Sequence, residues 1–162
     1  MENDINTTEL GFFHLYNGKI NEAFNLFALD YEENNSSKSL NGMAFCYLAN
    51  NNVPKMLETF KMAIEMNDTQ SLIYLGNYYN SKISFDEMKH CYIRACFVDG
   101  ISACKIARYY MSICDYESAI IYYMMSINKN NFIAMFELGE LYELIYNKKK
   151  AIFFYYKIIN NF

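Results

Sequence analysis

A short pattern of residue types recurs five times along the 162 residues of the chain, at nearly constant intervals. Each copy has a small residue, then Ala or Met twelve positions later, and an aromatic residue four positions after that. The small residues lie 33, 32, 31 and 32 positions apart; they are Gly11, Ala44, Gly76, Ala107 and Gly139. A period of this length indicates a repeat architecture, in which each unit buries its apolar face against the neighbouring units.

The spacing inside each copy predicts a pair of helices. An aliphatic residue comes directly before each small residue. A ring, which is Tyr or, in the first copy, His14, stands three positions after the small residue. Positions i, i+1 and i+4 share one helix face, as do the Ala or Met and the aromatic residue at i and i+4. Polar, turn-like residues separate the two groups, as in Asn17-Gly18-Lys19. We therefore predict an all-α fold of about five antiparallel helix hairpins.

Local features refine this prediction. Glycine destabilises a helix interior by about 1 kcal/mol relative to alanine, so we expect the small residues to mark a close approach between paired helices. Asp86 and Asp115 are expected to cap second helices, and Pro54 suits the first turn of another. Asp30 falls in a column that holds Ala, Ser or Ile in the other repeats. Because a buried unpaired carboxylate costs several kcal/mol, we expect the helix to tilt or fray near Asp30.

The composition excludes several classes of protein. A chain that is 53% hydrophobic buries too much apolar surface to stay disordered, and six Gly with one Pro are too few for a turn-rich β-sandwich. The longest apolar run, residues 151–156, is much shorter than the roughly 20 residues of a spanning helix, so we expect no membrane insertion. A net charge of -4 disfavours binding to nucleic acid. The first ten residues lack the apolar core of a secretion signal.

The five cysteines predict reduced thiols and a cytoplasmic location, because their number is odd and their surroundings are apolar and helical. Cys91, Cys96 and Cys104, with His90, leave open an alternative function as a metal-binding or enzyme-accessory protein. Their spacing is not that of a zinc ribbon, and the repeat register directs them to different helix faces. No nucleophile, base and orienting acid share a register position either. We therefore expect no catalytic residues, no metal, no cofactor and no enzyme activity.

The repeated columns resemble those of the tetratricopeptide repeat (TPR) family over nearly the whole chain. The resemblance is clearest in Leu75-Gly76-Asn77-Tyr78-Tyr79 and Leu138-Gly139-Glu140-Leu141-Tyr142. The Trp column and the inter-repeat Pro of that family are absent, and the junction in residues 91–103 resembles the related Sel-like repeats. The resemblance implies a right-handed α-solenoid, a single array with repeats at approximately 5–36, 37–68, 69–99, 100–131 and 132–162.

The resemblance also implies that function lies on a concave face lined by the first helix of each repeat. On that face we expect a partner peptide or helix to contact Phe12, Tyr16, Phe45, Asn77, Asn80, Arg108, Phe136 and Glu140. The chain would then be a protein-interaction scaffold or adaptor. Phe12 and Phe45 could equally fill gaps between adjacent helices. Some TPR proteins hold a carboxylate in a basic clamp, but Ile73 and Cys104 occupy two of the clamp positions here, which disfavours that mode.

The last predicted helix is apolar almost all round, which indicates burial on more than one side. A large apolar patch favours association. Asn160-Asn161-Phe162 also repeats Asn130-Asn131-Phe132, the start of the fifth repeat, so either the chain is a fragment or this surface meets another chain. In the second case we expect a homodimer or a partner contact through this helix, with the contact residues Ile152, Phe153, Phe154, Tyr156, Ile159 and Phe162.

Overall fold

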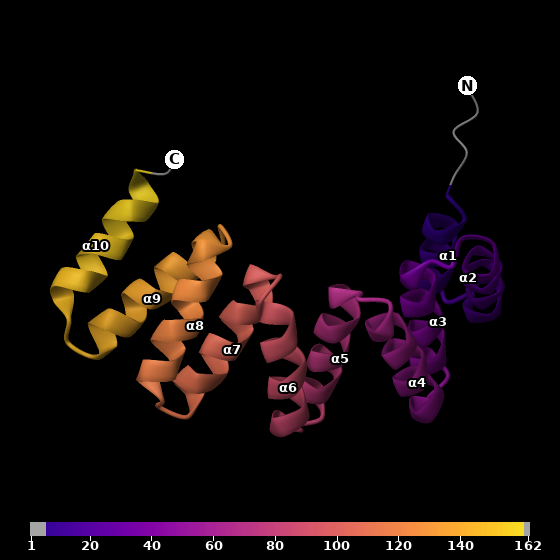
Figure 1. The fold of residues 1–162 in the computed structure, drawn as a ribbon, viewed down its shortest axis with the longest axis horizontal. Coiled ribbons are helices and arrows are strands. Elements are labelled where there is room, and N and C mark those ends of the chain that lie inside the picture. The colour runs from indigo at the N-terminus through magenta and orange to yellow at the C-terminus, as the bar shows by residue number, and fades with distance from the viewer. Residues whose placement is uncertain (1–5, 161–162) are drawn as a thin grey trace. The chain divides into compact units, whose positions relative to one another are not determined.

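The computed structural model describes residues 6–160, which are all-helical with short connections (Figure 1). The ten helices of these residues are α1 (Thr7–Tyr16), α2 (Ile20–Asn34), α3 (Ser37–Ala49), α4 (Val53–Glu65), α5 (Thr69–Ser81), α6 (Phe85–Cys96), α7 (Gly100–Ser112), α8 (Tyr116–Asn128), α9 (Phe132–Leu144) and α10 (Lys148–Ile159). They pack as sequential hairpins, and each repeat range expected from the sequence holds two of them. None of the helices in the described part of the chain is long and apolar enough to cross a membrane.

The turn inside each hairpin has one residue with a left-handed backbone, seven positions after the small residue. These residues are Gly18, Asn51, Ile83, Cys114 and Tyr146, with φ of 75°, 55°, 59°, 60° and 59°. A single left-handed residue ends a helix and lets its last carbonyl groups find hydrogen-bond donors. The constant position of this residue explains why every first helix ends, and every second helix begins, at the same distance from the small residue.

Side chains cap seven of the described helices at their N-termini. In each of them an Asn or Asp side chain accepts a hydrogen bond from a backbone N–H of the first turn; the caps are Asn6, Asn52, Asp68, Asp99, Asp115, Asn131 and Asn147. The predictions for Asp115 and for Pro54, in the first turn of α4, are confirmed. The prediction for Asp86 is wrong, because α6 begins at Phe85 with Ser84 as its N-cap and Asp86 lies inside the first turn.

Each glycine of the small column lies against the aromatic ring sixteen residues later in the same hairpin. A Cβ atom added to Gly11 would lie 2.6 Å from the ring of Phe27, and one added to Gly76 would lie 2.6 Å from the ring of Tyr92. At Gly139 the distance to the ring of Tyr155 would be 2.4 Å. The close approach expected from the sequence is therefore made between a helix backbone and a ring of the paired helix.

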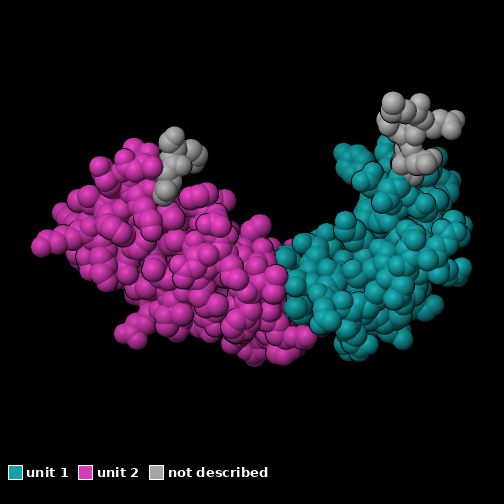
Figure 2. Space-filling view, turned by 45° about the horizontal axis from the view of Figure 1, so that its top comes forward, with its two compact units in different colours: residues 1–75 teal, residues 76–162 magenta. Residues whose placement is uncertain are grey.

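The chain divides into two compact units, residues 1–75 and residues 76–162 (Figure 2). In the first unit, Ala23, Phe27 and Cys46 form a buried cluster. The Phe27 ring is wholly buried and also lies against Gly42, where an added Cβ would approach it to 2.4 Å. The ring of Phe27 therefore joins α2 to both α1 and α3.

Asp30 is buried in the first unit, and it is fully hydrogen-bonded. Thr8 Oγ1 donates to its carboxylate at 2.9 Å and Asn34 Nδ2 at 2.8 Å, and the Ser39 hydroxyl donates as well. The expectation that α2 frays near Asp30 is wrong, because these donors, from α1, α2 and α3, replace the lost water and the helix continues to Asn34. Thr8 is itself buried in this contact.

These hydrogen bonds predict that acid destabilises the first unit. Burial opposes the charge of Asp30, but the hydrogen bonds from Ser39, Asn34, Thr8 and Ser36 hold its pKa below the ordinary value of 3.8. The unfolded chain therefore takes up a proton first, and the contribution of Asp30 to stability is lost as pH falls below that value. Urea unfolding between about pH 5 and about pH 2 should show a steeper loss of stability in the wild type than in Asp30→Asn. Equal slopes in the two proteins would contradict this role.

In the second unit, the largest buried cluster joins α7, α8, α9 and α10. Its central side chains include Ala107, Tyr123, Leu138 and Phe154. A smaller cluster around Met88, Tyr92 and Ile106 joins α6 to α7. These two clusters fix the first helices α7 and α9 that carry the site described below.

The hydrogen-bonded turn that leads from α6 into α7 spans one residue fewer than those at two other junctions, although three residues separate the helices at all three. The backbone N–H of Asp99 donates to the carbonyl of Ala95, four residues earlier. At the α4–α5 and α8–α9 junctions the corresponding N–H groups, of Asp68 and Asn131, donate to carbonyls five residues earlier. This shorter turn accounts for the interval of 31 positions between Gly76 and Ala107 in the sequence.

The strained backbone at Ile83 predicts that a single substitution there will stabilise the protein. A β-branched residue with φ of 59° is strained, and the side chain is 73% exposed, so it gains little from burial. Ile83→Asn should raise the free energy of unfolding by about 1 kcal/mol, because Asn tolerates the left-handed backbone. Thermal melting followed by circular dichroism checks this, with Ile121→Asn on the exposed face of α8 as the control. A lower melting temperature for Ile83→Asn would contradict the strain.

Candidate partner-binding groove

Two adjoining cavities lie along the first helices of the second unit. The first, of about 340 Å³, is lined by Asn77, Asn80, Phe85, Met88, Tyr92, Lys105, Arg108, Tyr109 and Ser112. The second, of about 460 Å³, is lined by Arg108, Met111, Ser112, Tyr123, Glu137 and Glu140. Because Arg108 and Ser112 line both, we treat the two cavities as one surface, called the groove below.

Asn77 anchors one end of the groove. Its side-chain oxygen accepts a hydrogen bond from the Tyr92 hydroxyl at 2.6 Å and another from Lys105 Nζ. The Lys105 ammonium also lies 5.2 Å from the centre of the Tyr92 ring, a distance typical of a cation–π contact. With its oxygen engaged, Asn77 has its amide N–H groups left for a ligand.

Burial changes the acid–base properties of this end of the groove. It raises the pKa of Tyr92 to about 12, so the phenol stays protonated and keeps donating to Asn77. Burial also lowers the pKa of Lys105 from its ordinary value. A cation that has lost part of its hydration gains more from a new hydrogen-bond acceptor than a fully hydrated one does.

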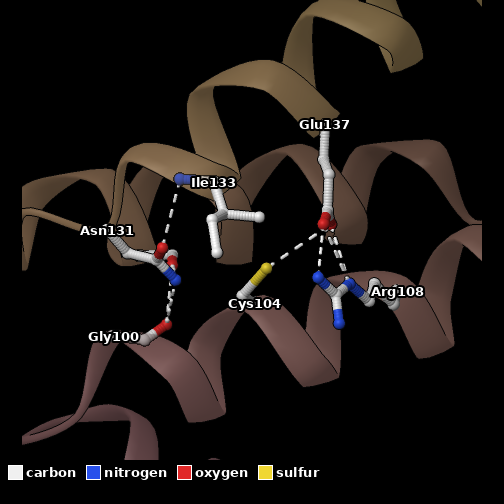
Figure 3. Close-up of polar contacts among 7 residues, drawn as sticks. Gly100, Cys104, Arg108, Asn131, Ile133 and Glu137 are labelled. Carbon is white, nitrogen blue, oxygen red and sulfur yellow. Dashed lines mark hydrogen bonds and ion pairs between the residues drawn. The ribbon is translucent and has the colours of Figure 1, made fainter.

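An ion pair between α7 and α9 lies at the middle of the groove (Figure 3). Arg108 Nε donates to the two carboxylate oxygens of Glu137 at 3.1 and 2.9 Å, and its Nη2 group also donates to Glu137. The Cys104 thiol donates to the same carboxylate, with 3.4 Å between Sγ and Oε2. Burial opposes the charge of Glu137, but the hydrogen bonds and charge of Arg108 hold its pKa below the ordinary value. The charge of Arg108 is therefore largely neutralised within the protein.

The connection before α9 holds that helix against α7. Figure 3 shows Asn131, whose side-chain oxygen accepts a hydrogen bond from the Ile133 N–H at 3.2 Å. Its amide group donates to the carbonyl of Gly100 at 3.4 Å. Because Asn131 caps α9 and binds the start of α7, it fixes the spacing across which Arg108 and Glu137 meet.

Three of the buried thiols, those of Cys46, Cys91 and Cys104, are poor nucleophiles. Burial, with the nearby negative charge of Glu137, raises the pKa of Cys104 to about 12, and burial raises those of Cys46 and Cys91 to about 11. A protonated thiol neither attacks a carbonyl nor binds a metal readily. Within residues 6–160, His, Cys, Asp and Glu form no group of three that could hold a metal ion. Nothing in this geometry favours the alternative function built on the Cys91 region, where His90 is exposed and Cys91 is buried.

The groove brings together four of the eight residues expected on the concave face: Asn77, Asn80, Arg108 and Glu140. Phe136 is 51% exposed and lies beside the ring of Tyr155, with 5.8 Å between ring centres. These five residues all belong to the second unit.

The other three expected residues belong to the first unit. Phe12 packs edge-on against Phe27, with 4.8 Å between ring centres, and Phe45 lies 4.8 Å from Tyr74. Both rings are half-buried and fill space between helices, which was the alternative left open by the sequence. Tyr16 is 92% exposed.

A cavity of about 570 Å³ also lies in the first unit, lined by Asn6, Thr8, Glu9, Phe12, Asp30, Asn34, Ser36 and Lys38. One of its two carboxylates, Asp30, already binds the donors of three helices.

The sequence analysis missed Glu137 and Lys105. A signal was present for Glu137: Arg108 follows the small residue of the fourth repeat, and Glu137 stands two positions before that of the fifth. These two columns face each other across neighbouring first helices. Lys105 carries the same signal: Asn77 follows the small residue of the third repeat, Lys105 stands two positions before that of the fourth, and its Nζ donates to Asn77.

The last helix exposes most of the side chains expected to mediate association. Ile152, Phe153, Tyr156 and Ile159 are 66%, 58%, 66% and 71% exposed. Phe154 is only 7% exposed and stacks on Tyr142, so its expected place on the contact face is wrong. It points inward because it shares a face of α10 with the buried Ala151. Phe162 lies outside the described residues.

No protein-family model and no curated protein matches the chain. It is similar to three solved structures of TPR proteins. MamA has 16% identity and a TM-score of 0.66 over 93% of this chain and 92% of its own. The pilF protein of Pseudomonas aeruginosa has 14% identity and a TM-score of 0.69, over 95% of this chain and 74% of its own. The C-terminal part of a TPR repeat-containing protein from Cytophaga hutchinsonii has 19% identity and a TM-score of 0.66, over 94% of this chain and 64% of its own.

At these identities the likeness shows the fold, so the chain has a TPR-like fold of sequential helix hairpins. Proteins of this fold are typically protein–protein interaction scaffolds and are generally not catalysts. Such a scaffold recognises its partner through side chains on its helices rather than through a reactive centre.

Proposed function

We propose that this chain is a non-enzymatic scaffold or adaptor that binds an extended segment or helix of a partner protein in the groove. The observation that supports this most is the convergence of Asn77, Asn80, Arg108 and Glu140 on one hollow surface. An extended peptide needs donors and acceptors for its backbone at regular intervals, together with apolar contacts for its side chains. The side chains of Asn80 and Ser112 can bond to the peptide backbone. Phe85 and Met111 can provide the apolar contacts.

Peptide selection with the intact chain tests this function. A random peptide library panned against the protein should yield binders whose affinity, measured by calorimetry, falls about tenfold or more in Asn80→Ala and Glu140→Lys. Both side chains are exposed, so the fold should not change. Glu58→Lys, on the exposed face of α4, is the matched control for a reversed charge. Selected peptides that bind all variants equally would contradict the groove as the binding site.

We also propose that the five hairpins act as one array in the cytoplasm, with a Sel-like junction between α6 and α7. The short turn from Ala95 to Asp99 supports the Sel-like junction. All five cysteines are free thiols, which is compatible with a reducing compartment.

A second activity, self-association through α10, is favoured by a specific observation. Three of its side chains, Ile152, Tyr156 and Ile159, form an apolar stripe and are each at least 66% exposed. Exposed apolar stripes of this kind commonly contact another chain.

A further inference from the structure

We propose that copies of this chain associate head to tail, with α10 of one copy packed on α1 of the next. This inference rests on the self-association proposed above, and it names the opposing surface and the symmetry of the contact. Both surfaces are identified by comparing equivalent columns of the repeats.

The α10 surface corresponds to positions that a following first helix covers elsewhere. Ile159 stands eight positions after the Ala column and is 71% exposed. Its counterparts Cys96 on α6 and Ile127 on α8 are 0% and 7% exposed, because α6 packs against α7 and α8 packs against α9. Ile152 is 66% exposed, whereas its counterpart Ile120 is half-buried against the main cluster.

Phe153 provides an internal comparison. It is 58% exposed, but its counterpart on α8, Ile121, is also exposed, at 60%. Phe153 therefore lies on a face that is open in an inner repeat too, and its exposure does not distinguish α10. The same holds for Tyr156, because its counterpart Met124 on α8 is 39% exposed. The contact surface on α10 therefore consists of Ile152 and Ile159.

The α1 surface corresponds to positions that a preceding second helix covers elsewhere. Phe13 stands two positions after the small residue and is 63% exposed. Its counterparts Cys46 on α3 and Leu141 on α9 are 1% and 0% exposed, since α2 packs on α3 and α8 packs on α9. Leu10 is half-buried, whereas its counterpart Leu138 is fully buried. The apolar surface on α1 is therefore of the kind that packs against a second helix, such as α10, elsewhere in the chain.

The charges of the two helices favour this pairing over a two-fold contact of α10 with itself. Helix α10 carries four lysines and no acidic residue, whereas α1 carries Glu9 and no Lys or Arg. Two copies of α10 placed together would bring like charges into proximity, while α10 beside α1 does not. A head-to-tail dimer still has one α1 surface and one α10 surface uncovered. Further copies can therefore add to either end until a ring closes.

Light scattering of the intact chain tests the head-to-tail contact. The average mass of the wild type should rise with concentration above 19.1 kDa. Phe13→Glu should be monomeric, and so should the double variant Ile152→Glu/Ile159→Glu. An equimolar mixture of these two proteins should form a one-to-one dimer, because one intact α1 surface and one intact α10 surface remain. Ile121→Glu, which changes an exposed isoleucine on α8, should associate like the wild type.

Each failure has a separate meaning. If Phe13→Glu associates as strongly as the wild type, the head-to-tail contact is overturned while self-association through α10 stands. If the wild type stays monomeric from micromolar to near-millimolar concentration, both are overturned, and peptide binding in the groove is unaffected. Circular dichroism of each variant, in which only exposed side chains change, verifies that the helices are intact.

Discussion

Replacing Gly76 with leucine is expected to lower the free energy of unfolding by about 3 kcal/mol. Even a single added carbon would come within 2.6 Å of the Tyr92 ring, which is buried and held by its hydrogen bond to Asn77. The ring cannot move aside without breaking that bond and the cluster around Met88. Ala107→Leu should have a similar effect, since the side chain of Ala107 on α7 is wholly buried in the cluster that joins α7 to α8, α9 and α10. Urea unfolding followed by circular dichroism measures both.

Two further variants give this prediction its controls. Gly76→Ala should also destabilise, although alanine favours a helix by about 1 kcal/mol over glycine. Asn80→Leu places the same bulk on the exposed side of α5 and should change stability by less than about 0.5 kcal/mol. If both Gly76→Leu and Ala107→Leu unfold at the wild-type urea concentration, the assignment of paired helices is incorrect.

Phe27→Ala is expected to be the most damaging single truncation, at about 4 kcal/mol. The ring is 0% exposed and contacts Gly11 of α1, Gly42 of α3 and the Phe12 ring. Removing it opens a cavity at the contact of three helices, and glycines on two sides have no side chain with which to fill it. Chemical denaturation of the intact chain gives the loss.

Phe153→Ala is the matched control for this truncation, because its ring is 58% exposed on α10. It should cost less than about 0.5 kcal/mol in unfolding free energy. Equal losses at Phe27 and Phe153 would show that burial of the ring between glycines is not what stabilises the first unit.

The helix hairpins could be predicted from the sequence because their information is local and repeated. The interval from a small residue to its ring is the same in every copy, and it is the interval that brings Gly76 to Tyr92 and Gly139 to Tyr155. A ring needs a position without a side chain opposite it, so the two columns constrain each other. One copy alone would have been ambiguous, but five copies in register were not.

What the sequence could not predict depends on partners from other helices. Asp30 was expected to disrupt α2 because its column is apolar, yet Thr8 and Ser39 supply donors from α1 and α3. Tertiary contacts decided that case. Phe154 is different, because its position three residues after the Ala column places it on the buried face of α10, and this spacing was already present in the sequence.

The groove was predictable only in part. Asn77 and Arg108 were found because the TPR resemblance indicates which first-helix positions face a ligand. The sequence did not show that Arg108 would be held by Glu137, which changes its role from a free cation to half of an ion pair. In the function proposed above, a ligand would therefore be recognised through the amides and the Lys105 ammonium rather than through a free guanidinium.

Nuclear Overhauser effects between glycine α-protons and aromatic ring protons are a direct test of the helix pairing in each hairpin. We expect strong effects from Gly11 to Phe27, from Gly76 to Tyr92 and from Gly139 to Tyr155. The same α-protons should be shifted upfield by the ring currents, because each glycine lies against its ring. Glycine α-protons with ordinary shifts and no effect to these rings would contradict the hairpin pairing on which the groove and the two association surfaces depend.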